Sequence, residues 1–434
     1  MGSRATQLPI LIMGAGISGL TLAQACCKYD IPHLLFERDI SPTARSAGWG
    51  LTLNWSLPTF RSLVPDHVLA QLPETLVNKA AVDAGEKGTF TFFDLDTGTA
   101  KWKVPATERI RVSRERLRIL LLTGLAVNWG KALSAVRKVE NGVTVTFSDG
   151  SEETGCLLVG CDGANSQTRK LCHPEDYRNK QLPIRFIGAG VRYPRSEING
   201  MYKLDRFFLQ GSHPSTDAFL WFSFLDVPGD PHTISHDVEA ENEVEMYRCQ
   251  IMTSWPYRAG FLGHDAPIEV PDGKEEKLAL MKKVASDFTE PFRCVVQNIP
   301  PASEVKEVFL ADWLPRATST TALGHELGGH VVLVGDAAHA MVMYRGEGAN
   351  HSIVDVGHLI DLLRPLVKDS TSDEQWQQAV HHYEEEMIER TAVAVLASRQ
   401  ACMDAHDHKR LHDNSPLVRR RLMRSDLEET EAAR

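Results

Sequence analysis

The chain has 434 residues, which is too many for one ordinary hydrophobic core and indicates two or more closely packed units. Hydrophobic residues make up 43% of the sequence and charged residues 24%, a balance that excludes a disordered or collagen-like chain. The formal net charge of -10 leaves no general basic field for phosphate backbones, so we expect no nucleic-acid partner.

Signals for secretion and for membrane insertion are also missing from the sequence pattern. The eight cysteines are scattered without a CxxC pair, which is typical of reduced thiols and predicts a cytoplasmic protein. The apolar opening at residues 8–20 lacks the basic region and the cleavage site of a signal peptide. No later apolar run reaches the roughly 18 residues of a membrane span. We therefore expect a soluble monomer or homodimer with no stable membrane insertion.

The first informative segment is a glycine-rich loop between a strand and a helix. Residues 8–13 predict a short buried strand, and a helical pattern covers residues 20–29. Between them, Gly14 permits a tight turn, Gly16 lets a pyrophosphate approach the backbone, and Gly19 lets the helix pack closely on the strand. The helix N-terminus would face the phosphates, so this segment is typical of a dinucleotide-binding unit.

A carboxylate stands at the end of the next predicted strand. Residues 33–37 form an apolar stretch that ends at Glu37, where an acid would hydrogen-bond an adenosine ribose. Glu37 would repel the 2′-phosphate of NADP, although the neighbouring Arg38 weakens that argument. These residues leave NAD, NADP and FAD open as the bound dinucleotide.

Further along the chain, a predicted helix is followed by a strand with a polar end. Residues 111–118 predict an amphipathic helix with Ser113 as its N-cap. Residues 156–160 predict an apolar strand that runs into an Asp-Gly turn at Asp162. That turn precedes a polar helix start.

A second strand that runs into an aspartate is predicted near the end of the chain. Residues 330–335 predict a strand that runs into Asp336 within the motif GDAAH. A glycine-rich stretch at residues 346–350 then precedes a helical run at residues 353–366. Glycines at that helix start would let the backbone approach a ligand closely.

Together, these motifs resemble those of a known family. GxGxxG at residues 14–19, Asp-Gly at residues 162–163, and GDAAH at residues 335–339 with the downstream GxGxN at residues 346–350 stand in the order found in FAD-dependent monooxygenases of the aromatic-hydroxylase type. The resemblance covers nearly the whole chain and is strongest to fungal members that act in secondary metabolism. The resemblance implies that this protein is a class A flavoprotein monooxygenase similar to para-hydroxybenzoate hydroxylase.

The resemblance implies a non-covalent FAD, with NADPH or NADH as co-substrate and O2 as oxidant. It implies that Asp336 accepts hydrogen bonds from the ribityl chain, that Arg114 contacts the FAD, and that Asp162 touches the FAD and the nicotinamide. For Asp162 a purely turn-forming role stays open, and for Arg114 a solvated helix charge stays open. The expected cofactor-binding residues are Gly14, Gly16, Gly19, Glu37, Arg38, Gly50, Arg114, Asp162, Asp336, Gly346, Gly348, Ala349 and Asn350.

The fold class predicted from these patterns is α/β. A Rossmann-like FAD-binding domain is expected at residues 1–80, 100–180 and 317–370, and C-terminal helices and a tail at residues 371–434. Short alternating apolar stretches predict an inserted antiparallel-sheet domain for the substrate at residues 81–99 and 181–316.

The substrate domain offers candidates for a binding pocket. Its aromatic residues could line a pocket for a flat molecule, although alternating aromatics in strands are more often core. Arg192 and Tyr257 are the candidate catalytic residues for polarising a substrate. His408 and His412 are spaced like ligands on one helix face, but nothing completes a metal motif, so no metal is expected.

The resulting prediction is an NAD(P)H-dependent FAD monooxygenase. By resemblance, it inserts one oxygen into an aromatic or polycyclic natural-product intermediate through a flavin C4a-hydroperoxide. Many relatives carry prolines after GDAAH where this chain has Ala340 and Met343, so epoxidation and Baeyer-Villiger oxidation stay open beside hydroxylation. An oxidase, reductase or halogenase of the same fold, or a non-catalytic flavin-bound redox sensor, is the alternative.

Overall fold

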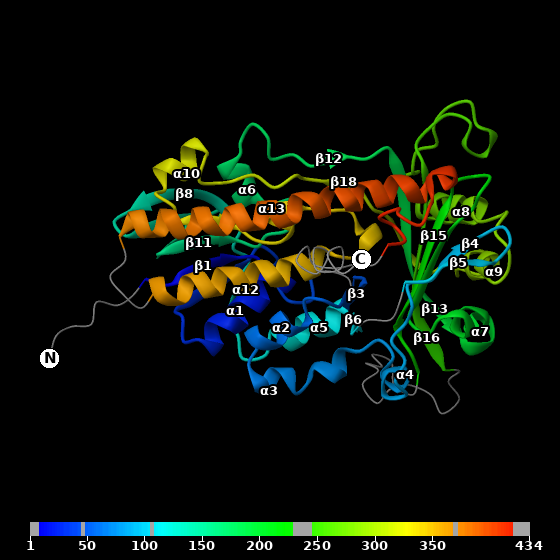
Figure 1. The fold of residues 1–434 in the computed structure, drawn as a ribbon, viewed down its shortest axis with the longest axis horizontal. Helices are drawn as coiled ribbons and strands as arrows, with labels where there is room; N and C mark the ends of the chain where they lie inside the picture. Colours follow the sequence, from blue (N-terminus) through cyan, green and yellow to red (C-terminus); the bar gives the residue numbers. More distant parts are fainter. Residues whose placement is uncertain (1–7, 45–47, 105–107, 229–244, 368–371, 420–434) are drawn as a thin grey trace, which may run out of the picture.

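The computed structural model describes residues 8–44, 48–104, 108–228, 245–367 and 372–419 (Figure 1). A parallel sheet with its helices and a large antiparallel sheet occupy opposite ends of the molecule (Figure 1). Within the described residues, no helix combines the length and the apolar character that a membrane crossing requires.

The parallel sheet contains the predicted strands of the nucleotide-binding unit. Its strand order is β19-β11-β1-β2-β7, and all four pairings are parallel. The strands are β19 (Val331–Leu333), β11 (Leu157–Gly160), β1 (Ile10–Met13), β2 (His33–Glu37) and β7 (Val127–Trp129). The central strand β1 is buried on both faces, which explains its continuous apolar sequence.

The two faces of this sheet are covered by different layers. Ile10 and Ile12 belong to a core shared with α1 (Ile17–Lys28) and α12 (Gly348–Leu366). Leu11 belongs to a second core with a three-stranded antiparallel sheet. Successive side chains of a strand point to opposite faces, so one strand supplies both cores. The three strands of that small sheet are β8 (Leu133–Val139), β9 (Gly142–Phe147) and β10 (Glu152–Gly155).

The large sheet has seven strands in the order β17-β13-β16-β15-β14-β4-β5. Its pairings are antiparallel except for β14 with β4. The strands are β17 (Glu304–Glu307), β13 (Ile184–Pro194), β16 (Met246–Pro256), β15 (Phe219–Asp226), β14 (Phe208–Ser212), β4 (Phe92–Asp94) and β5 (Ala100–Trp102). The predicted combination of a Rossmann-like unit with an antiparallel-sheet unit is thus confirmed, while the proposed domain boundaries stay a prediction.

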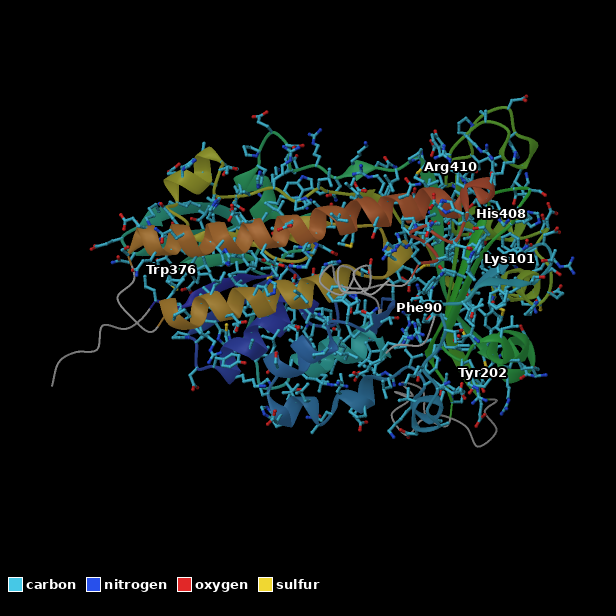
Figure 2. All side chains as sticks on the ribbon, viewed as in Figure 1. Phe90, Lys101, Tyr202, Trp376, His408 and Arg410 are labelled. Carbon is cyan, nitrogen blue, oxygen red and sulfur yellow. The ribbon has the colours of Figure 1, made fainter. Side chains whose placement is uncertain are left out.

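One face of the large sheet is closed by helices, and the other face looks toward the parallel-sheet unit (Figure 1). The covering helices are α7 (Arg195–Leu204), α8 (Lys274–Val284) and α9 (Phe292–Gln297), which share an apolar core with the sheet. Phe90 lies between the two units (Figure 2). The large sheet can therefore contribute to a cavity between the units only through side chains on its open face.

The long helix α13 (Asp373–Ala405) runs beside α12 and reaches the large sheet (Figure 1). It begins at a capping box in which Ser372 and Gln375 exchange hydrogen bonds. Near its end, Arg399 forms an ion pair with Asp312. Leu417 is fully buried, so the chain remains packed beyond the end of this helix. Residues 420–434, which hold most of the charged tail, lie outside the described residues.

Shorter elements complete the chain. Helices of this group are α2 (Leu57–Leu63), α3 (Asp66–Leu69), α4 (Lys79–Asp83), α5 (Arg114–Leu121), α6 (Gln167–Cys172), α10 (Ala322–Glu326) and α11 (Asp336–His339). Short strands are β3 (Gly50–Leu53), β6 (Ile110–Ser113), β12 (Lys180–Gln181) and β18 (Ala311–Asp312). Single 3-10 turns are η1 (Leu72–Thr75), η2 (Phe261–Gly263), η3 (Met343–Arg345) and η4 (His408–Arg410).

The helix predicted behind the N-cap Ser113 is present, and the residues before that cap form a strand. Residues 110–113 form β6, which pairs antiparallel with β3, and the helix α5 begins only at Arg114. Residues 110–113 are extended because their backbone groups find hydrogen-bond partners on β3. The predicted N-cap is confirmed, since the Oγ atom of Ser113 accepts a hydrogen bond from the backbone N–H of Arg116.

A buried carboxylate joins three parts of the nucleotide-binding unit. Asp355 of α12 accepts hydrogen bonds from the backbone N–H of Gly335 (2.8 Å) and from His339 Nε2 (2.6 Å). Its other oxygen accepts from Arg390 of α13 (2.7 Å). These partners hold the pKa of Asp355 below its ordinary value although burial acts in the opposite direction. Asp355 thus fastens the Gly335 turn and α13 to α12.

Replacing Asp355 with Ala should strongly destabilise the protein, because the substitution removes one of the two carboxylates that pair with the buried Arg390 and leaves the Gly335 N–H without its acceptor. The expected decrease in the free energy of unfolding is about 3–5 kcal/mol, measured by urea denaturation. Asp361→Ala is the matched control, since Asp361 is exposed on the same helix. Equal losses in both variants would show that the Asp355 network contributes nothing.

Candidate functional site

An elongated cavity runs from the glycine-rich loop to the open face of the large sheet. Its first chamber, about 420 Å³ in volume, is lined by Gly14, Glu37 and Arg38 among others. The second chamber, about 350 Å³, ends at Trp221, Gln250 and Met252 of the large sheet. The residues that line both chambers are Gly16, Arg114, Cys161 and Gly163. The two chambers therefore adjoin each other at these four residues.

The glycines of the loop have three separable roles. Gly14 has a φ of 106°, and a Cβ atom there would lie 2.4 Å from the carbonyl oxygen of Cys161. A Cβ atom on Gly19 would lie 2.0 Å from the carbonyl oxygen of Gly14. Gly16 has no atom within 4 Å of such a position, and it faces both chambers. Gly14 and Gly19 therefore serve the backbone turn and the helix packing, whereas Gly16 keeps ligand space free.

Glu37 lines the first chamber at the end of β2, and it also holds the loop. One of its carboxylate oxygens accepts from the backbone N–H of Ala15 (2.8 Å), and the other accepts from the N–H of Asp39 (3.1 Å). Arg118 Nε donates to the carbonyl oxygen of Ala15 from the other side (3.0 Å). The peptide groups on both sides of Ala15 are thus fixed before any ligand is bound.

Asp162 lies at the wall of the first chamber, but its carboxylate is hydrogen-bonded to the protein segment that follows it. It accepts hydrogen bonds from the backbone N–H groups of Gln167 (2.8 Å) and Thr168 (3.0 Å) and from the hydroxyl of Ser166 (2.5 Å). These contacts are those of a carboxylate that caps the start of α6. The turn-forming role of Asp162 is therefore present in the structure.

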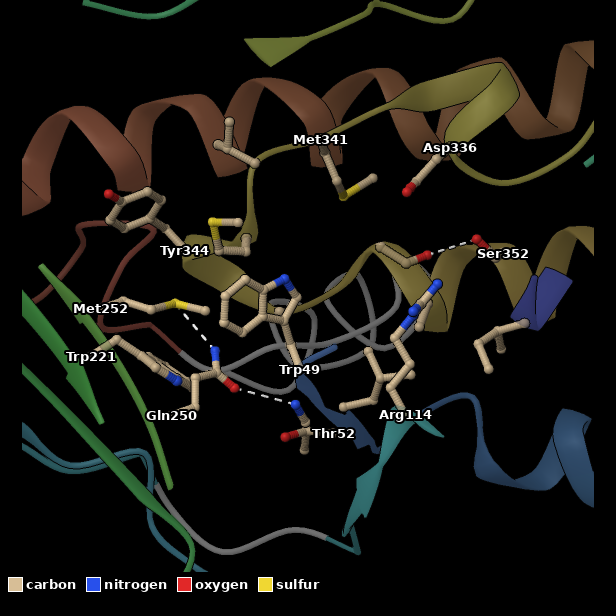
Figure 3. A pocket seen from close by; sticks show the side chains of 18 of the residues that line it. Trp49, Thr52, Arg114, Trp221, Gln250, Met252, Asp336, Met341, Tyr344 and Ser352 are labelled. Atoms are coloured by element: carbon tan, nitrogen blue, oxygen red, sulfur yellow. Dashed lines mark hydrogen bonds between the residues drawn. The ribbon is translucent and has the colours of Figure 1, made fainter. Parts of the chain in front are cut away.

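Asp336 faces the second chamber, near the junction with the first. Figure 3 shows it with Ser352 and Arg114 at one end of the chamber, while Trp221 and Gln250 stand at the other. Asp336 is exposed at the chamber wall, and desolvation by the protein packed around it still raises its pKa above the ordinary value, against the charges of His339, Arg114 and Arg169.

Arg169 is a supporting residue that the sequence motifs did not single out. Its side chain is 1% exposed, and its Nη1 donates to the carbonyl oxygens of Asp336 and Ala337, both at 3.3 Å. Arg169 therefore ties the helix after the Asp-Gly turn to the GDAAH turn. The sequence does show an arginine seven residues after Asp162. Its contacts with Asp336 and Ala337, 167 and 168 residues further along the chain, cannot be predicted from local spacing.

The glycine-rich start of α12 also lines the second chamber. Gly346 has a φ of 65°, and Gly348 and Ala349 form the first turn of the helix. Asn350 differs from the expectation, since its side chain is fully buried and does not line either chamber. It accepts from the Asn54 N–H and donates to the Thr52 carbonyl, and so it fastens α12 to β3.

The wall of the second chamber is rich in aromatic and sulfur-containing side chains. Trp49 stands between the Asp336 end and the sheet end (Figure 3). The aromatic lining residues are Trp49, Phe90, Phe186, Phe219, Trp221 and Tyr344. Met341 and Met343 line the same chamber in the loop where many relatives were expected to carry prolines. A flexible, apolar wall of this kind suits a flat organic molecule.

Strand alternation decides which aromatic residues of the substrate domain reach the cavity. Phe219 and Trp221 of β15 line the second chamber. Phe222 and Phe224 of the same strand belong to the core behind the sheet. This sorting follows from the two-residue period of a strand.

Arg192 and Tyr257, the candidate catalytic residues, are not brought to the cavity. Arg192 is exposed on β13 near the end of the strand. Tyr257 donates its hydroxyl hydrogen to Glu269, and the guanidinium of Arg185 stacks on its ring at 3.6 Å. That cluster lies outside both chambers, so the assignment of a substrate-polarising role to these two residues is corrected.

Gly50 was expected to contact the cofactor, and the structure gives it a second role. A Cβ atom on Gly50 would lie 2.5 Å from Nη2 of Arg111. The missing side chain therefore makes room for a buried guanidinium that lines the second chamber. The sequence analysis did not single out Arg111, whose side chain is aimed at the large sheet by the strand β6.

The histidine pair near the C-terminus is also separated by the fold. Helix α13 ends at Ala405, so His408 and His412 do not share a helix face. His408 lies in η4, where its backbone N–H donates to Asp217. The spacing alone was misleading because the helix stops before the first histidine.

A strand-loop-helix nucleotide unit joined by one cavity to an antiparallel sheet defines a dinucleotide-binding protein with a separate ligand chamber. Comparison with known proteins identifies the family within this class. The family model described as FAD binding domain matches residues 7–197 and 316–395. The chain is 46% identical to a probable FAD-dependent monooxygenase of Arthroderma benhamiae, over 97% of both chains.

Two further comparisons agree. The FAD-dependent monooxygenase dbaB of Emericella nidulans is 38% identical, over 81% of this chain and 86% of that protein. The structure of 2,6-dihydroxypyridine-3-hydroxylase from Arthrobacter nicotinovorans matches with a TM-score of 0.67 at 16% identity, and covers 95% of this chain and 96% of that chain. This last likeness concerns the fold. The chain belongs to the FAD-binding-domain family and, within it, to the FAD-dependent monooxygenases.

Substitution of Gly16 and of Gly19, two glycines of the same loop, should have different effects, one on FAD binding and the other on folding stability. Gly16→Ala should fold normally, because Gly16 has an extended backbone and open space, yet it should weaken FAD binding by about tenfold or more because the methyl group occupies the pyrophosphate approach. Gly19→Ala should instead lower the free energy of unfolding by about 1–3 kcal/mol through overpacking against Gly14. Thermal melting and FAD titration would measure both effects, and a Gly16→Ala protein with undiminished FAD affinity would contradict the assignment.

Proposed function

We propose that this FAD-dependent monooxygenase uses NADPH or NADH and O2 to insert one oxygen atom into an aromatic or polycyclic natural-product intermediate. Hydroxylation is the proposed reaction, with epoxidation and Baeyer-Villiger oxidation as the variants to be tested. The observation that carries the proposal is the pair of adjoining chambers, because a chamber at the dinucleotide loop lies directly beside an aromatic chamber large enough for a small molecule.

The residues of the cavity fit an FAD molecule in an extended conformation. In this proposal, Glu37 and Arg38 hold the adenosine end, and the Gly14–Gly19 loop holds the pyrophosphate. Asp336 holds the ribityl chain, and Gly346, Gly348 and Ala349 face the ring system. The open position at Gly16 supports this fit, because no atom lies within 4 Å of the place that a side chain would occupy there. Bound FAD would supply the redox chemistry and the oxygen activation.

The chain itself contributes binding, orientation and exclusion of water. The wall of the second chamber includes the apolar or aromatic side chains of Met341, Val342, Tyr344, Phe219 and Met252. An apolar enclosure of this kind limits water near a reactive centre. The fixed peptide groups around Ala15 need little reorganisation when the pyrophosphate binds.

The test of the function is NAD(P)H consumption by the FAD-loaded protein against a panel of aromatic polyketides, prenylated phenols and indoles. We expect at least one compound to accelerate NAD(P)H oxidation and to gain the mass of one oxygen atom. Addition of a halogen would support the halogenase alternative, and H2O2 as the only product would support an oxidase. Absence of any acceleration across the panel would favour a redox sensor.

Gly348→Val should damage flavin chemistry more than folding. The nearest atoms to a Cβ there are Asp336 Oδ1 at 3.5 Å and Met341 Cγ at 3.7 Å, which are ordinary contacts. The added side chain would push the start of α12 away from the flavin ring. Loss of that positive helix end should lower the flavin reduction potential by the equivalent of about 0.3–2 kcal/mol.

The matched control is Gly190→Val, because Gly190 has open space on β13 and does not line the cavity. Reduction potentials, melting temperatures and H2O2 release would be compared for both variants. An unchanged potential and unchanged coupling in Gly348→Val would show that the flavin ring does not meet this helix.

A further inference from the structure

Arg111 is a buried cation at the sheet end of the second chamber. Its side chain is 7% exposed and lines that chamber. Nη1 donates to the Thr52 hydroxyl at 3.0 Å, and Nη2 donates to the Ser223 hydroxyl at 2.9 Å. Nε is buried without a hydrogen-bond partner among the described residues. A guanidinium has five N–H donors, so two neutral hydroxyl acceptors leave most of them unused.

No carboxylate of the described residues lies within ion-pair distance of Arg111. Asp205 is the acid whose charge influences it, but the oxygens of Asp205 accept from the backbone N–H groups of Phe207, Phe208 and Thr89. Desolvation lowers the pKa of Arg111 to about 9, which expresses how unfavourable its charge is in this position. A buried charge is normally paired, so a missing counter-ion beside a ligand cavity indicates that the ligand brings it.

The groups around the Arg111 guanidinium include aromatic rings, which contact the positive charge but carry no negative charge to neutralise it. Its guanidinium carbon lies 5.3 Å from the ring centre of Phe208 and 5.8 Å from that of Trp221. These two rings stack on each other at 5.1 Å. Cation-π contacts orient a guanidinium and leave its edge available for an oxygen acceptor. The absent Cβ of Gly50 provides the space for that guanidinium.

Arg109 shows how a buried arginine is satisfied when its role is structural. It is also 7% exposed and also contacts an aromatic ring, that of Phe90 at 4.8 Å. Its guanidinium, however, donates to the backbone carbonyls of Lys87 and Gly88. Arg109 does not line the second chamber. The two arginines therefore differ in their acceptors and in their access to the ligand space.

We propose that Arg111 binds an anionic oxygen of the substrate, so that the second chamber selects planar aromatic molecules carrying a phenolate or a carboxylate. This inference rests on the proposed function for the identity of the cavity as a substrate site. Gln250, on strand β16 of the large sheet, stands at the same end of the chamber (Figure 3). The aromatic wall holds the ring system, and Arg111 fixes which edge of the molecule faces the large sheet.

The test compares ligand pairs that differ in charge at constant shape, using calorimetric titration of the FAD-loaded protein. One pair is 2-naphthoate with 2-naphthamide, and the other is 7-hydroxycoumarin, titrated above its own pKa, with 7-methoxycoumarin. We expect the anion of at least one pair to bind about 10- to 100-fold more tightly than its neutral partner. The pair that shows the larger ratio distinguishes a carboxylate substrate from a phenolate substrate.

Three variants assign the preference to Arg111. Arg111→Gln should abolish the preference for the anion, and Arg111→Lys should retain part of it because the charge remains while the planar fork is lost. Arg109→Gln should lower the melting temperature and leave the preference intact. Equal preference in Arg111→Gln and in the unmodified protein would overturn the proposal.

The unmodified protein provides a test that does not depend on the folding of any variant. If it binds both members of each pair equally, Arg111 serves the fold alone and the proposal is overturned. The anion preference is a binding measurement, so it is separate from turnover. Oxygenated product without an anion preference would refute only this inference, whereas an anion preference without NAD(P)H oxidation would refute only the proposed reaction.

Discussion

The buried carboxylate of Asp355 is the interaction on which the geometry of the cavity depends. It joins the turn at Gly335, the helix α12 and, through Arg390, the helix α13. Asp336 follows that turn directly, and Gly348 begins the same α12. A shift of the carboxylate would therefore move two walls of the cavity together. Because the group is fully buried, its free-energy contribution depends on all partners being present at once.

The large sheet divides its side chains between stability and recognition. Side chains on one face pack with α7, α8 and α9, and those on the other face close the second chamber. The open face carries aromatic rings together with Gln250 and the nearby Arg111, a mixture that an ordinary core would not contain. Stability from the closed face allows the open face to keep polar groups that are incompletely paired. This division explains how a protein can hold a buried cation ready for a ligand.

Motifs made of several elements predicted roles more securely than single residues did. The strand, glycine loop and helix at the start of the chain, together with Glu37, indicate the nucleotide-binding unit from the order of their residues alone. Arg192 and Tyr257 were single candidates, and each lies outside the cavity. A lone polar residue in a strand carries no information about which face or which end of the strand it occupies.

The sequence by itself determined the α/β class, the parallel strands, the loop glycines, the N-cap at Ser113 and the family. These features depend on contacts between residues close in the chain, or on motifs whose spacing is fixed by a ligand. Only the tertiary structure decided that Asn350 braces β3 and that Arg111 lies at the sheet end of the cavity. The physical reason is that strand pairing and the packing of the two units set the direction of these side chains. Both are made by segments far apart in the sequence, which local patterns do not record.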